Sequence, residues 1–405
     1  MAHKQLSVEE REEIQQVSCA MKEVQSTTIV VIMEIILPKM SRVYNLFIIY
    51  PMSISREVLL EILRDACRAP SGDNTQPWRF LVKRNIIYVI NTPEKDTSLF
   101  NWQQRTNYIA LGACIENLCV SALGKRLRAK VALFPEHADR LIVAAVTLTP
   151  ERSMGSGLVP YLAKRASNRK KYLEKEVEPE KLSTLASCVH DDKSRLTFIT
   201  ERPSLERVAR IVSVGERLAL ENKSIHDFLF AHITWSKEED SKKHGFFIDT
   251  FEFAPPQRVA FRLFRHWNIL KLFLSLGVSK AIVKDIEKVH ATAAAFGAII
   301  ISNETPEAFL QAGMVLERLW LTATKAGLSL QPTTTVHFLG ARVSAGDSGG
   351  LSSEHQSLLK QNYVALSREF GLNSSERFGF VFRLGYADPP SAMTTRFEPK
   401  VLFEE

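Results

Sequence analysis

The chain has 405 residues, of which 45% are hydrophobic and 24% charged, and its formal net charge is +7. Domains usually hold roughly 100–200 residues, so this length suits two domains or a fused pair with a sizeable core. The positive charge favours anionic ligands such as phosphorylated cofactors. It is spread along the chain without a nucleic-acid-binding pattern, so we do not expect nucleic acid as a partner.

Residues 1–52 are interpreted as a helical N-terminal extension without a signal peptide. The apolar run Ile29–Leu37 contains Glu34, and the run Val43–Tyr50 is too short to cross about 30 Å of hydrocarbon, so no stable membrane insertion is expected. The five cysteines form no C-x-x-C pair, which is typical of reduced thiols and indicates a cytoplasmic protein.

A turn rich in hydroxyl and amide groups follows the first predicted element of the body. We expect a helix over Ser55–Ala69 with Ser55 as its N-cap, and two short strands over Phe80–Ile90. Polar side chains on a fixed turn between them suit the edge of a flat polar ring, such as a flavin. An ordinary loop is the alternative interpretation. The candidate binding residues of the turn are Pro70, Ser71, Gly72, Asn74 and Gln76.

The chain contains a remote internal repeat. Leu111–Ala122 resembles Ala312–Ala323, with one glycine and one glutamate at equivalent positions in each. Both segments are apolar almost all round, so both are predicted to be buried helices. Each is followed by a strand-like run that ends near proline, Leu141–Leu148 and Phe378–Leu384. Two copies of so long a period favour a fused pseudo-dimer over a solenoid.

A cationic cluster lies at Lys164–Tyr172. Arg165 and Arg169 are four residues apart, so in a helix they would share one face, with Ser167 between them. Arginines near a helix start favour a phosphate group. The alternative is a solvated basic surface.

Further elements follow with less chemical content. Helix is predicted at Pro179–Ser187, a buried strand at Phe296–Ile301 and a flexible Gly/Ser-rich loop at Ala341–Ser353. Arg258–Val289 alternates basic and apolar residues at helical spacing. It is interpreted, in order of preference, as a surface helix pair, a lid over a ligand, or an interfacial membrane helix.

Three motifs together resemble the flavin-dependent nitroreductase superfamily, and specifically its tandem, fused members of the mycobacterial Acg type. The resemblance runs from about Ser55 to about Phe403. The family pattern Ala-Pro-Ser-x-x-Asn-x-Gln-Pro-Trp matches Ala69–Trp78, Arg-x-Ser-x-Arg matches Arg165–Arg169, and the closing Arg-x-Gly, prolines and final arginine match Arg383–Gly385, Pro389, Pro390 and Arg396.

The resemblance implies an α+β nitroreductase-like fold, internally duplicated as a fused pseudo-dimer with one flavin mononucleotide (FMN) at the seam. Residues 53–155 would form the first half and residues 156–405 the second, with a lid-like insertion around residues 235–290. The turn is kept in the first half and the arginines in the second, so one complete site is expected.

The family pattern also assigns roles to the candidate residues. Phosphate and ribityl contacts are expected from Arg165, Ser167, Arg169 and Arg396, and ring contacts from the turn. Gln331, Pro332 and Thr333 are expected beside the central ring, where a backbone N–H would bond a ring nitrogen. Trp235 and Phe246 would cover the ring on the substrate side, or serve as plain core. The resemblance implies cofactor-binding residues only, without a catalytic side chain or a metal.

The activity implied is hydride transfer from NAD(P)H through the flavin to an electron-poor small molecule. A flavin-storage protein with a closed lid, and a flavin-dependent dehydrogenase or flavin-cleaving enzyme, stay open as alternatives. A monomeric pseudo-dimer or a further homodimer is expected. Gly346–Gly350 copies the nucleophile motif of trypsin-like proteases, but its surroundings supply no triad, so proteolysis is not expected.

Overall fold

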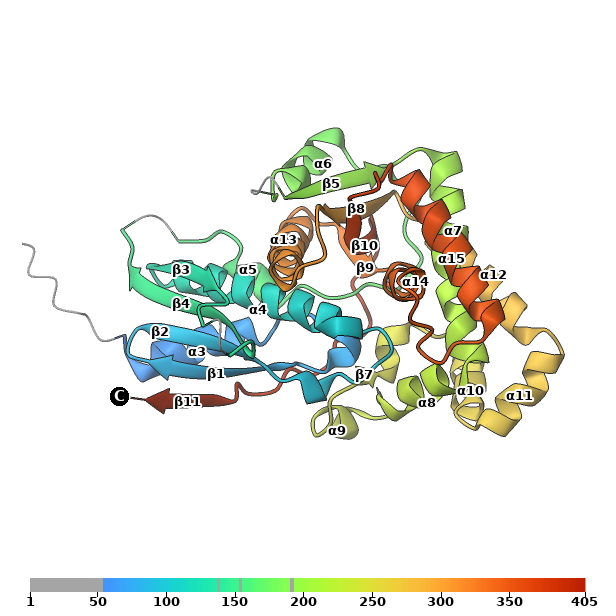
Figure 1. Cartoon of the computed structure of the whole chain (residues 1–405), viewed down its shortest axis with the longest axis horizontal. Helices are drawn as coiled ribbons and strands as arrows, with labels where there is room; N and C mark the ends of the chain where they lie inside the picture. The colour runs from blue at the N-terminus through green and yellow to red at the C-terminus, as the bar shows by residue number, and fades with distance from the viewer. Residues whose placement is uncertain (1–53, 137–138, 153–154, 190–192, 405) are drawn as a thin grey trace, which may run out of the picture. The chain divides into compact units, whose positions relative to one another are not determined.

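A computed structural model describes residues 54–136, 139–152, 155–189 and 193–404. Residues Ile54–Glu405 form one compact unit, in which helices pack against two main β-sheets (Figure 1). The predicted α+β class is therefore confirmed. The expected N-terminal extension lies outside the described residues.

Helix α3 (Arg56–Ala66) begins where the sequence predicts it, because Ser55 Oγ accepts a hydrogen bond from the N–H of Val58. Its apolar residues recur at helical spacing, so they form a single stripe that is buried against the first sheet and α4. The buried residues of this stripe are Leu59, Ile62, Leu63 and Ala66.

The first sheet has the strand order β11-β1-β2-β4-β3. Its last strand comes from the C-terminal end of the chain and pairs in parallel with β1, with Val401 opposite Phe80. The tail before β11 is thereby held close to the turn that precedes β1. The strands are β1 (Trp78–Lys83), β2 (Ile86–Asn91), β3 (Leu127–Leu133), β4 (Ile142–Pro150) and β11 (Val401–Glu404).

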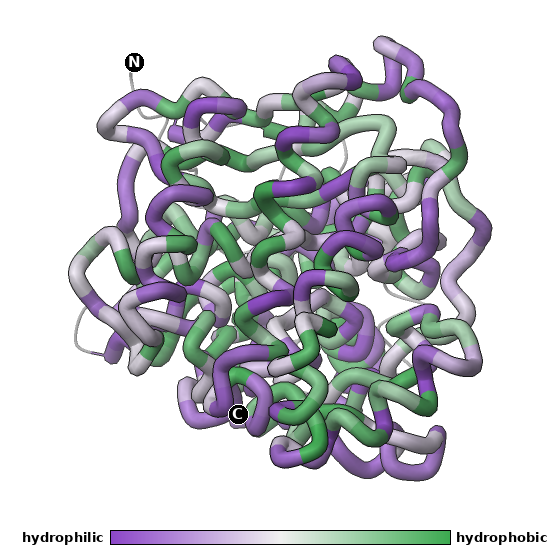
Figure 2. Tube along the Cα trace, turned by 90° about the vertical axis from the view of Figure 1, so that its right-hand side faces the viewer, coloured by the Kyte–Doolittle hydropathy of each residue, from purple (hydrophilic) through white to green (hydrophobic). Residues whose placement is uncertain are grey.

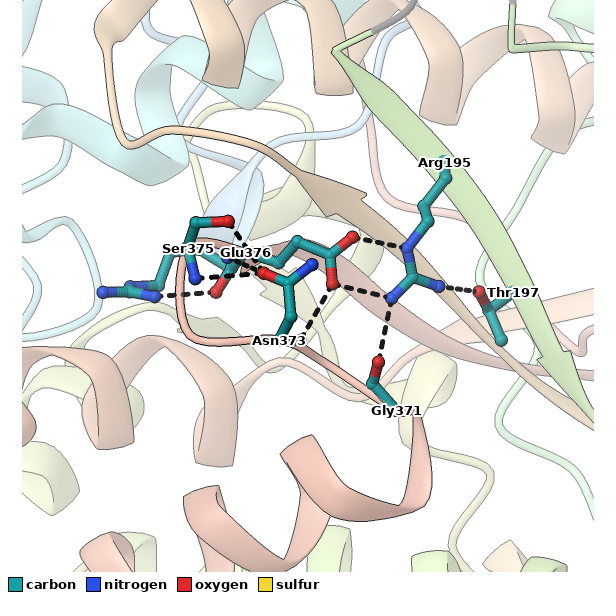
Figure 3. A network of polar contacts seen from close by, with 7 residues as sticks. Arg195, Thr197, Gly371, Asn373, Ser375 and Glu376 are labelled. Carbon is teal, nitrogen blue, oxygen red and sulfur yellow. Dashed lines mark hydrogen bonds and ion pairs between the residues drawn. The ribbon is translucent and has the colours of Figure 1, made fainter.

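The second sheet has the order β5-β8-β10-β9 and is covered on both faces, as the fully buried β8 requires. An ion pair stabilises the edge strand β5: Arg195 contacts Glu376 with nitrogen–oxygen distances of 2.6 and 2.9 Å. Arg195 also donates a hydrogen bond to the hydroxyl of Thr197 on the same strand (Figure 3). The strands are β5 (Ser194–Ile199), β8 (Ala295–Ile301), β9 (Ser329–Pro332) and β10 (Arg377–Gly385).

Helices α4 (Arg105–Gly124) and α13 (Pro306–Lys325), the predicted repeat, pack on each other between the two sheets (Figure 1). Glycines allow the close crossing. A Cβ on Gly112 would lie 2.0 Å from the carbonyl oxygen of Leu310, and one on Gly313 would lie 2.1 Å from that of Ile109. Although α4 with its preceding turn is long and apolar enough to cross a membrane, 78% of the apolar window is buried inside the protein.

The remaining helices lie outside the sheets. Helices α7, α14 and α15 cover the face of the second sheet opposite α13. Figure 2 shows the molecule from the right-hand side of Figure 1. On this face, hydrophilic and hydrophobic residues alternate along the chain. The helices are α5 (Val159–Leu162), α6 (Pro179–Ala186), α7 (Arg202–Glu221), α8 (Lys223–Ala231), α9 (Lys237–Asp240), α10 (Pro255–Phe264), α11 (Trp267–Ser275), α12 (Val278–His290), α14 (Thr335–Ser344) and α15 (Ser353–Glu369).

Smaller elements complete the unit, and one prediction needs correction. Four 3-10 turns lie at Gly72–Asn74, Pro93–Lys95, Trp102–Gln104 and Ile248–Phe251, and a two-stranded ribbon joins β6 (Ile233–Thr234) to β7 (Phe246–Phe247). The loop predicted over Ala341–Ser353 is wrong in its first part. Helix α14 continues to Ser344 because Leu339 and Val343 pack into a buried cluster with α7 and α15.

Candidate functional site

The turn after α3 has an unusual backbone. Asp73, Asn74 and Gln76 have φ angles of 46°, 55° and 49°. These angles lie in the left-handed region, which residues other than glycine seldom adopt. The Ser71 hydroxyl accepts a hydrogen bond from the N–H of Gln76 at 3.0 Å and closes the turn. Residues held in such conformations cluster at ligand sites, where the surrounding structure fixes them.

The C-terminal tail lies directly on this turn. The Asn74 side chain donates to the carbonyl oxygen of Thr395 at 3.0 Å, and the N–H of Phe397 donates to Gln76 Oε1 at 3.0 Å. Between them, Arg396 donates through Nη1 to Asn74 Oδ1 at 2.5 Å and through Nε to the carbonyl oxygen of Ala69 at 3.2 Å. The structure thus brings two predicted elements, the turn and Arg396, into direct contact.

Arg165 reaches the same turn from the other side. Its Nη2 donates to the carbonyl oxygen of Arg68 at 2.5 Å, and its guanidinium lies over the Trp320 ring, 4.7 Å from the ring centroid. The nearest carboxylate is that of Glu317 on α13, with 3.0 Å between Arg165 Nε and Oε1. Arg165 Nε and the Glu317 carboxylate lie within ion-pair distance but make no hydrogen bond with each other. We therefore describe this contact as a buried ion pair without a directed hydrogen bond.

Burial controls the charges of this cluster. It raises the pKa of Glu317 to about 7 despite the opposing effect of Arg165. Burial, and next the positive charge of Arg165, lower the pKa of Arg396 to about 9. Two buried arginines therefore share one carboxyl group whose charge is itself disfavoured. Such an environment is stabilised by a further anion.

A cavity of about 320 Å³ opens beside this cluster. It is lined by four arginines and one carboxylate, so its charge is positive. The lining residues are Arg64, Arg68, Leu162, Ala163, Arg165, Met393, Thr394, Arg396, Phe397 and Glu398.

The segment around Arg165 is not helical, which corrects the prediction that Arg165 and Arg169 share a helical face. Helix α5 ends at Leu162 and the next helix begins at Pro179. The backbone between them makes tertiary contacts instead: Ser167 forms a parallel bridge with Leu330 of β9. Residues four apart in an extended segment are separated by about 13 Å along the chain, against about 6 Å in a helix, so Arg165 and Arg169 reach different surroundings.

Arg169 contacts residues 246–251, within the predicted lid-like insertion, rather than the cluster around Arg165. Its Nη1 donates to the carbonyl oxygen of Thr250 at 3.2 Å. The guanidinium lies 5.3 Å from the ring centroid of Phe246 and 5.4 Å from that of Phe251, which are cation–π distances. Phe246, predicted on the substrate side, therefore lies beside a predicted cofactor-binding arginine.

Two carboxyl groups face Arg169. Burial, and next the charge of Asp96, raise the pKa of Asp73 to about 7, although Arg169 opposes the shift. Burial also raises the pKa of Glu216 on α7 against the effect of Arg169. Glu216 nevertheless keeps an exposed side chain.

The predicted residues of β9 lie at the end of the second sheet. Gln331 Oε1 accepts from Arg383 Nε at 2.7 Å, Pro332 pairs opposite Phe382, and the N–H of Thr333 donates to the carbonyl oxygen of Val381 at 2.9 Å. The Thr333 N–H is thus engaged within the sheet. Its buried hydroxyl has no hydrogen-bond partner among the described residues.

Trp235 lies in an aromatic cluster of the insertion itself. Its ring centroid is 6.4 Å from that of Phe230 and 6.2 Å from that of Phe261. This placement fits the core alternative for Trp235. The insertion nevertheless borders the turn through His244, whose Nδ1 is 3.4 Å from Gln76 Nε2.

Sequence reasoning missed several residues of this region. Glu317 carried a signal, because a glutamate within an apolar core helix requires a cationic partner. Arg383 belongs to the closing motif, but its role was not predicted: it is fully buried and donates to the carbonyl oxygens of Val289 and Lys170 as well as to Gln331, so it fixes β9 beside the cationic segment. Arg64 on α3 and Arg68 just after it looked like surface residues and carried no signal.

The protease-like motif forms a turn between α14 and α15. Asp347 pairs with Arg342 and accepts a hydrogen bond from the N–H of Gly349 at 2.8 Å, so its carboxylate stabilises the turn. Within the described ranges, no group of three or more His, Cys, Asp and Glu side chains is placed to hold a metal ion.

Comparisons with known proteins give remote matches. No family model matches the chain. It is 22% identical over 342 residues to the uncharacterized protein MT1398 of Mycobacterium tuberculosis (strain CDC 1551 / Oshkosh), a match that covers 83% of this chain and 46% of that protein. It is 24% identical over 182 residues to a protein of M. tuberculosis (strain ATCC 25618 / H37Rv) with the provisional name NAD(P)H nitroreductase acg, covering 44% of this chain and 54% of that protein.

The chain spans about half the length of these curated relatives. Among solved structures, it is 15% identical to the FMN and NADPH-dependent nitroreductase NfnB from Sphigopyxis sp. strain HMH, a match that covers 60% of this chain and 95% of that one with a TM-score of 0.33. At that score the likeness supports no conclusion about the arrangement of this chain. The sequence matches confirm the resemblance to nitroreductases of the Acg type.

Proposed function

We propose that this chain, a nitroreductase-superfamily protein of the Acg type, binds one FMN and acts as an NAD(P)H-dependent flavin oxidoreductase. The observation that carries the proposal is the convergence of the left-handed turn with Arg165 and Arg396. Arg165 donates to the carbonyl oxygen of Arg68, and Arg396 donates to that of Ala69 and to Asn74. These groups come from three remote parts of the chain.

The cluster fits a phosphate group. A phosphate monoester carries about two negative charges at neutral pH. Arg165 Nε is buried without a hydrogen bond, and the pKa of Arg396 is lowered to about 9 by burial and by Arg165. An anion in the adjacent cavity would accept charge-assisted hydrogen bonds from both guanidinium groups and relieve their repulsion. Arg64 and Arg68 also line the cavity, where Arg64 pairs with Glu398 and Arg68 with Asp65.

A flavin ring would lie between the turn and the end of β9. The resemblance assigns Pro70, Ser71, Gly72 and Gln331 to its surroundings. Because the Thr333 N–H is engaged by Val381, we assign the donor for a ring nitrogen to the first turn of α14, whose N-cap residue Thr334 makes no side-chain cap. Arg169, held by Phe246 and Thr250, would close the far side.

When bound, FMN would supply the redox chemistry, accepting hydride from a reduced nicotinamide and passing it to an electron-poor small molecule. The chain's own residues bind and orient the cofactor and exclude water. We assign no catalytic side chain.

The test is optical. Protein purified with FMN should be yellow, and anaerobic NADPH should bleach the flavin absorbance near 450 nm. Reduction by dithionite but not by NADPH or NADH would contradict the oxidoreductase proposal. A protein that takes up no FMN at all would contradict the cofactor assignment.

Flavin storage is the second candidate, and specific contacts favour it. The insertion holds the turn and the tail: Asp240 accepts hydrogen bonds from the N–H and hydroxyl of Thr395 at 2.8 and 2.6 Å, and His244 lies against Gln76. A covered ring would exclude substrates. Yellow protein that stays oxidised with NADPH but releases FMN when Asp240→Ala loosens the insertion would support storage.

A further inference from the structure

Helices α10 and α11 each expose large apolar side chains. On α10 these are Val259 and Leu263, four residues apart, with 61% and 49% of their surface exposed. On and just after α11 they recur at intervals of three and four residues, which places them on one helical face. This second set is Ile269, Leu272, Phe273 and Leu276, with exposures of 36%, 66%, 37% and 75%.

The opposite side of the same helices is packed inward. Leu270 of α11 is fully buried and Phe264 at the end of α10 is nearly so. The helices therefore have a normal protein-facing side and a second apolar side without a partner in the described residues. Figure 1 shows α11 at the periphery, beyond α10 and α12.

The charged residues of this segment are all basic. Between Pro255 and Lys284 the sequence has six arginines and lysines and no aspartate or glutamate. Arg258 pairs with Asp249 at 2.6 Å. Within the described residues the other five have no ion pair: Arg262, Arg265, Lys271, Lys280 and Lys284.

We propose that α10, α11 and the start of α12 form a surface that binds anionic lipid bilayers. Helices that lie in a membrane interface combine an apolar face with flanking Lys and Arg residues, and anionic headgroups attract such clusters. Contiguous exposed apolar side chains rimmed by polar groups mark interaction surfaces.

Other occupants fit less well. A nucleic acid would use the cations but leave Leu272 and Leu276 in water. A second copy of the chain would place two clusters of the same sign against each other, which is repulsive. A bilayer satisfies both the apolar side chains and the cations.

The binding would be peripheral. Helix α10 has 10 residues and α11 has 9, whereas about 20 are needed to span the hydrocarbon core. The apolar side chains would reach into the boundary between headgroups and acyl chains, while Lys271, Lys280 and Lys284 extend toward the phosphates.

Co-sedimentation of the full chain with vesicles tests the proposal. Vesicles of phosphatidylcholine with 30% phosphatidylglycerol should pellet the protein, and pure phosphatidylcholine vesicles should not. Raising NaCl to 0.5 M should release most of it, because salt screens the attraction.

Variants locate the surface. Lys280→Glu with Lys284→Glu should weaken binding at least about 25-fold, since each cation near an anionic surface contributes about fivefold. Leu272→Glu with Leu276→Glu should weaken it more than about tenfold. The matched control is Lys360→Glu with Val364→Glu on α15, both exposed, which should change binding less than about twofold.

Several results would overturn the proposal. Failure of the full chain to pellet with either vesicle would do so. Equal pelleting with both vesicles would remove the role of the cations. Equal effects of test and control variants would place the surface elsewhere. A dimer that Leu272→Glu converts to monomer would assign the surface to self-association. The salt and lipid dependence of the unmodified chain decides the question even if a variant misfolds.

Discussion

The two central helices each carry one glutamate at an equivalent position, and the two surroundings differ. Glu116 on α4 pairs with Arg318, with nitrogen–oxygen distances of 2.7 and 3.1 Å, beside a cavity of about 360 Å³ whose lining is largely apolar. Glu317 on α13 lies 3.0 Å from Arg165 without a directed hydrogen bond, beside a cavity of about 320 Å³ lined by four arginines.

The difference shows what an anion site requires beyond a cation. The guanidinium of Arg318 is already engaged by both oxygens of Glu116. Arg165 and Arg396, by contrast, share Glu317, whose pKa burial raises to about 7. The side with a surplus of buried positive charge is therefore suited to a phosphate, and the other side is not. This asymmetry supports our proposal of a duplicated fold with a single surviving site.

Disturbing the helix crossing should affect both sides at once, because both glutamates depend on it. In Gly313→Ala the new Cβ meets the backbone of Ile109 at 2.1 Å, and backbone cannot move aside easily. We expect a loss of about 3 kcal/mol or more in the free energy of unfolding, measured by urea denaturation. Gly277→Ala is the control: its φ is +79° but open space surrounds it, so the loss should be near 1 kcal/mol. Equal losses would contradict the close crossing.

Removing one arginine should disturb one side only. Arg165→Ala leaves Glu317 buried without its cation, and we expect a loss of about 3 kcal/mol in unfolding free energy. The loss stays near the lower end of the usual range because Glu317 can take up a proton. Arg318→Ala should cost less, since the Arg318 side chain is 36% exposed and water can reach its place. A larger loss in Arg318→Ala would reverse our assignment of the two sides.

The pH dependence of stability should reveal the raised pKa of Glu317 on the α13 side. The pKa of Glu317 is raised to about 7 in the folded chain from an ordinary value of 4.5. Its contribution to stability is therefore fully present below about pH 4.5 and is lost as the pH rises through about 7. In Glu317→Gln, the fall of unfolding free energy between pH 5 and 7 should be shallower by up to about 1.4 kcal/mol per pH unit. Parallel curves for the two ligand-free proteins would contradict the raised pKa.

The sequence predicted correctly those helices and strands that are determined by their own residues. Helix α3 carries its own cap at Ser55 and its own apolar stripe, and the strands near Asn85 and at Ala295–Ile301 are set by pattern. The internal repeat, with Gly112 and Gly313 at equivalent positions, correctly predicted that α4 and α13 are buried helices.

Long-range contacts decide what local sequence could not. The segment around Ser167 is extended because Asn168 N–H donates to the carbonyl oxygen of Leu330 and Tyr172 N–H donates to the Thr292 hydroxyl, so tertiary partners replace a helix. The cavity arginine Arg64 is recruited only because the C-terminal tail returns to β1. The sequence of residues 56–66 does not predict that the C-terminal tail pairs with β1.

Titration of the ligand-free chain with FMN tests the central claim most directly. We predict one FMN per chain, a dissociation constant raised about 10- to 150-fold in Arg396→Ala, corresponding to about 1.5–3 kcal/mol for a charged hydrogen bond, and no change in Arg318→Ala. Two FMN per chain, or equal weakening by both substitutions, would contradict the single phosphate site.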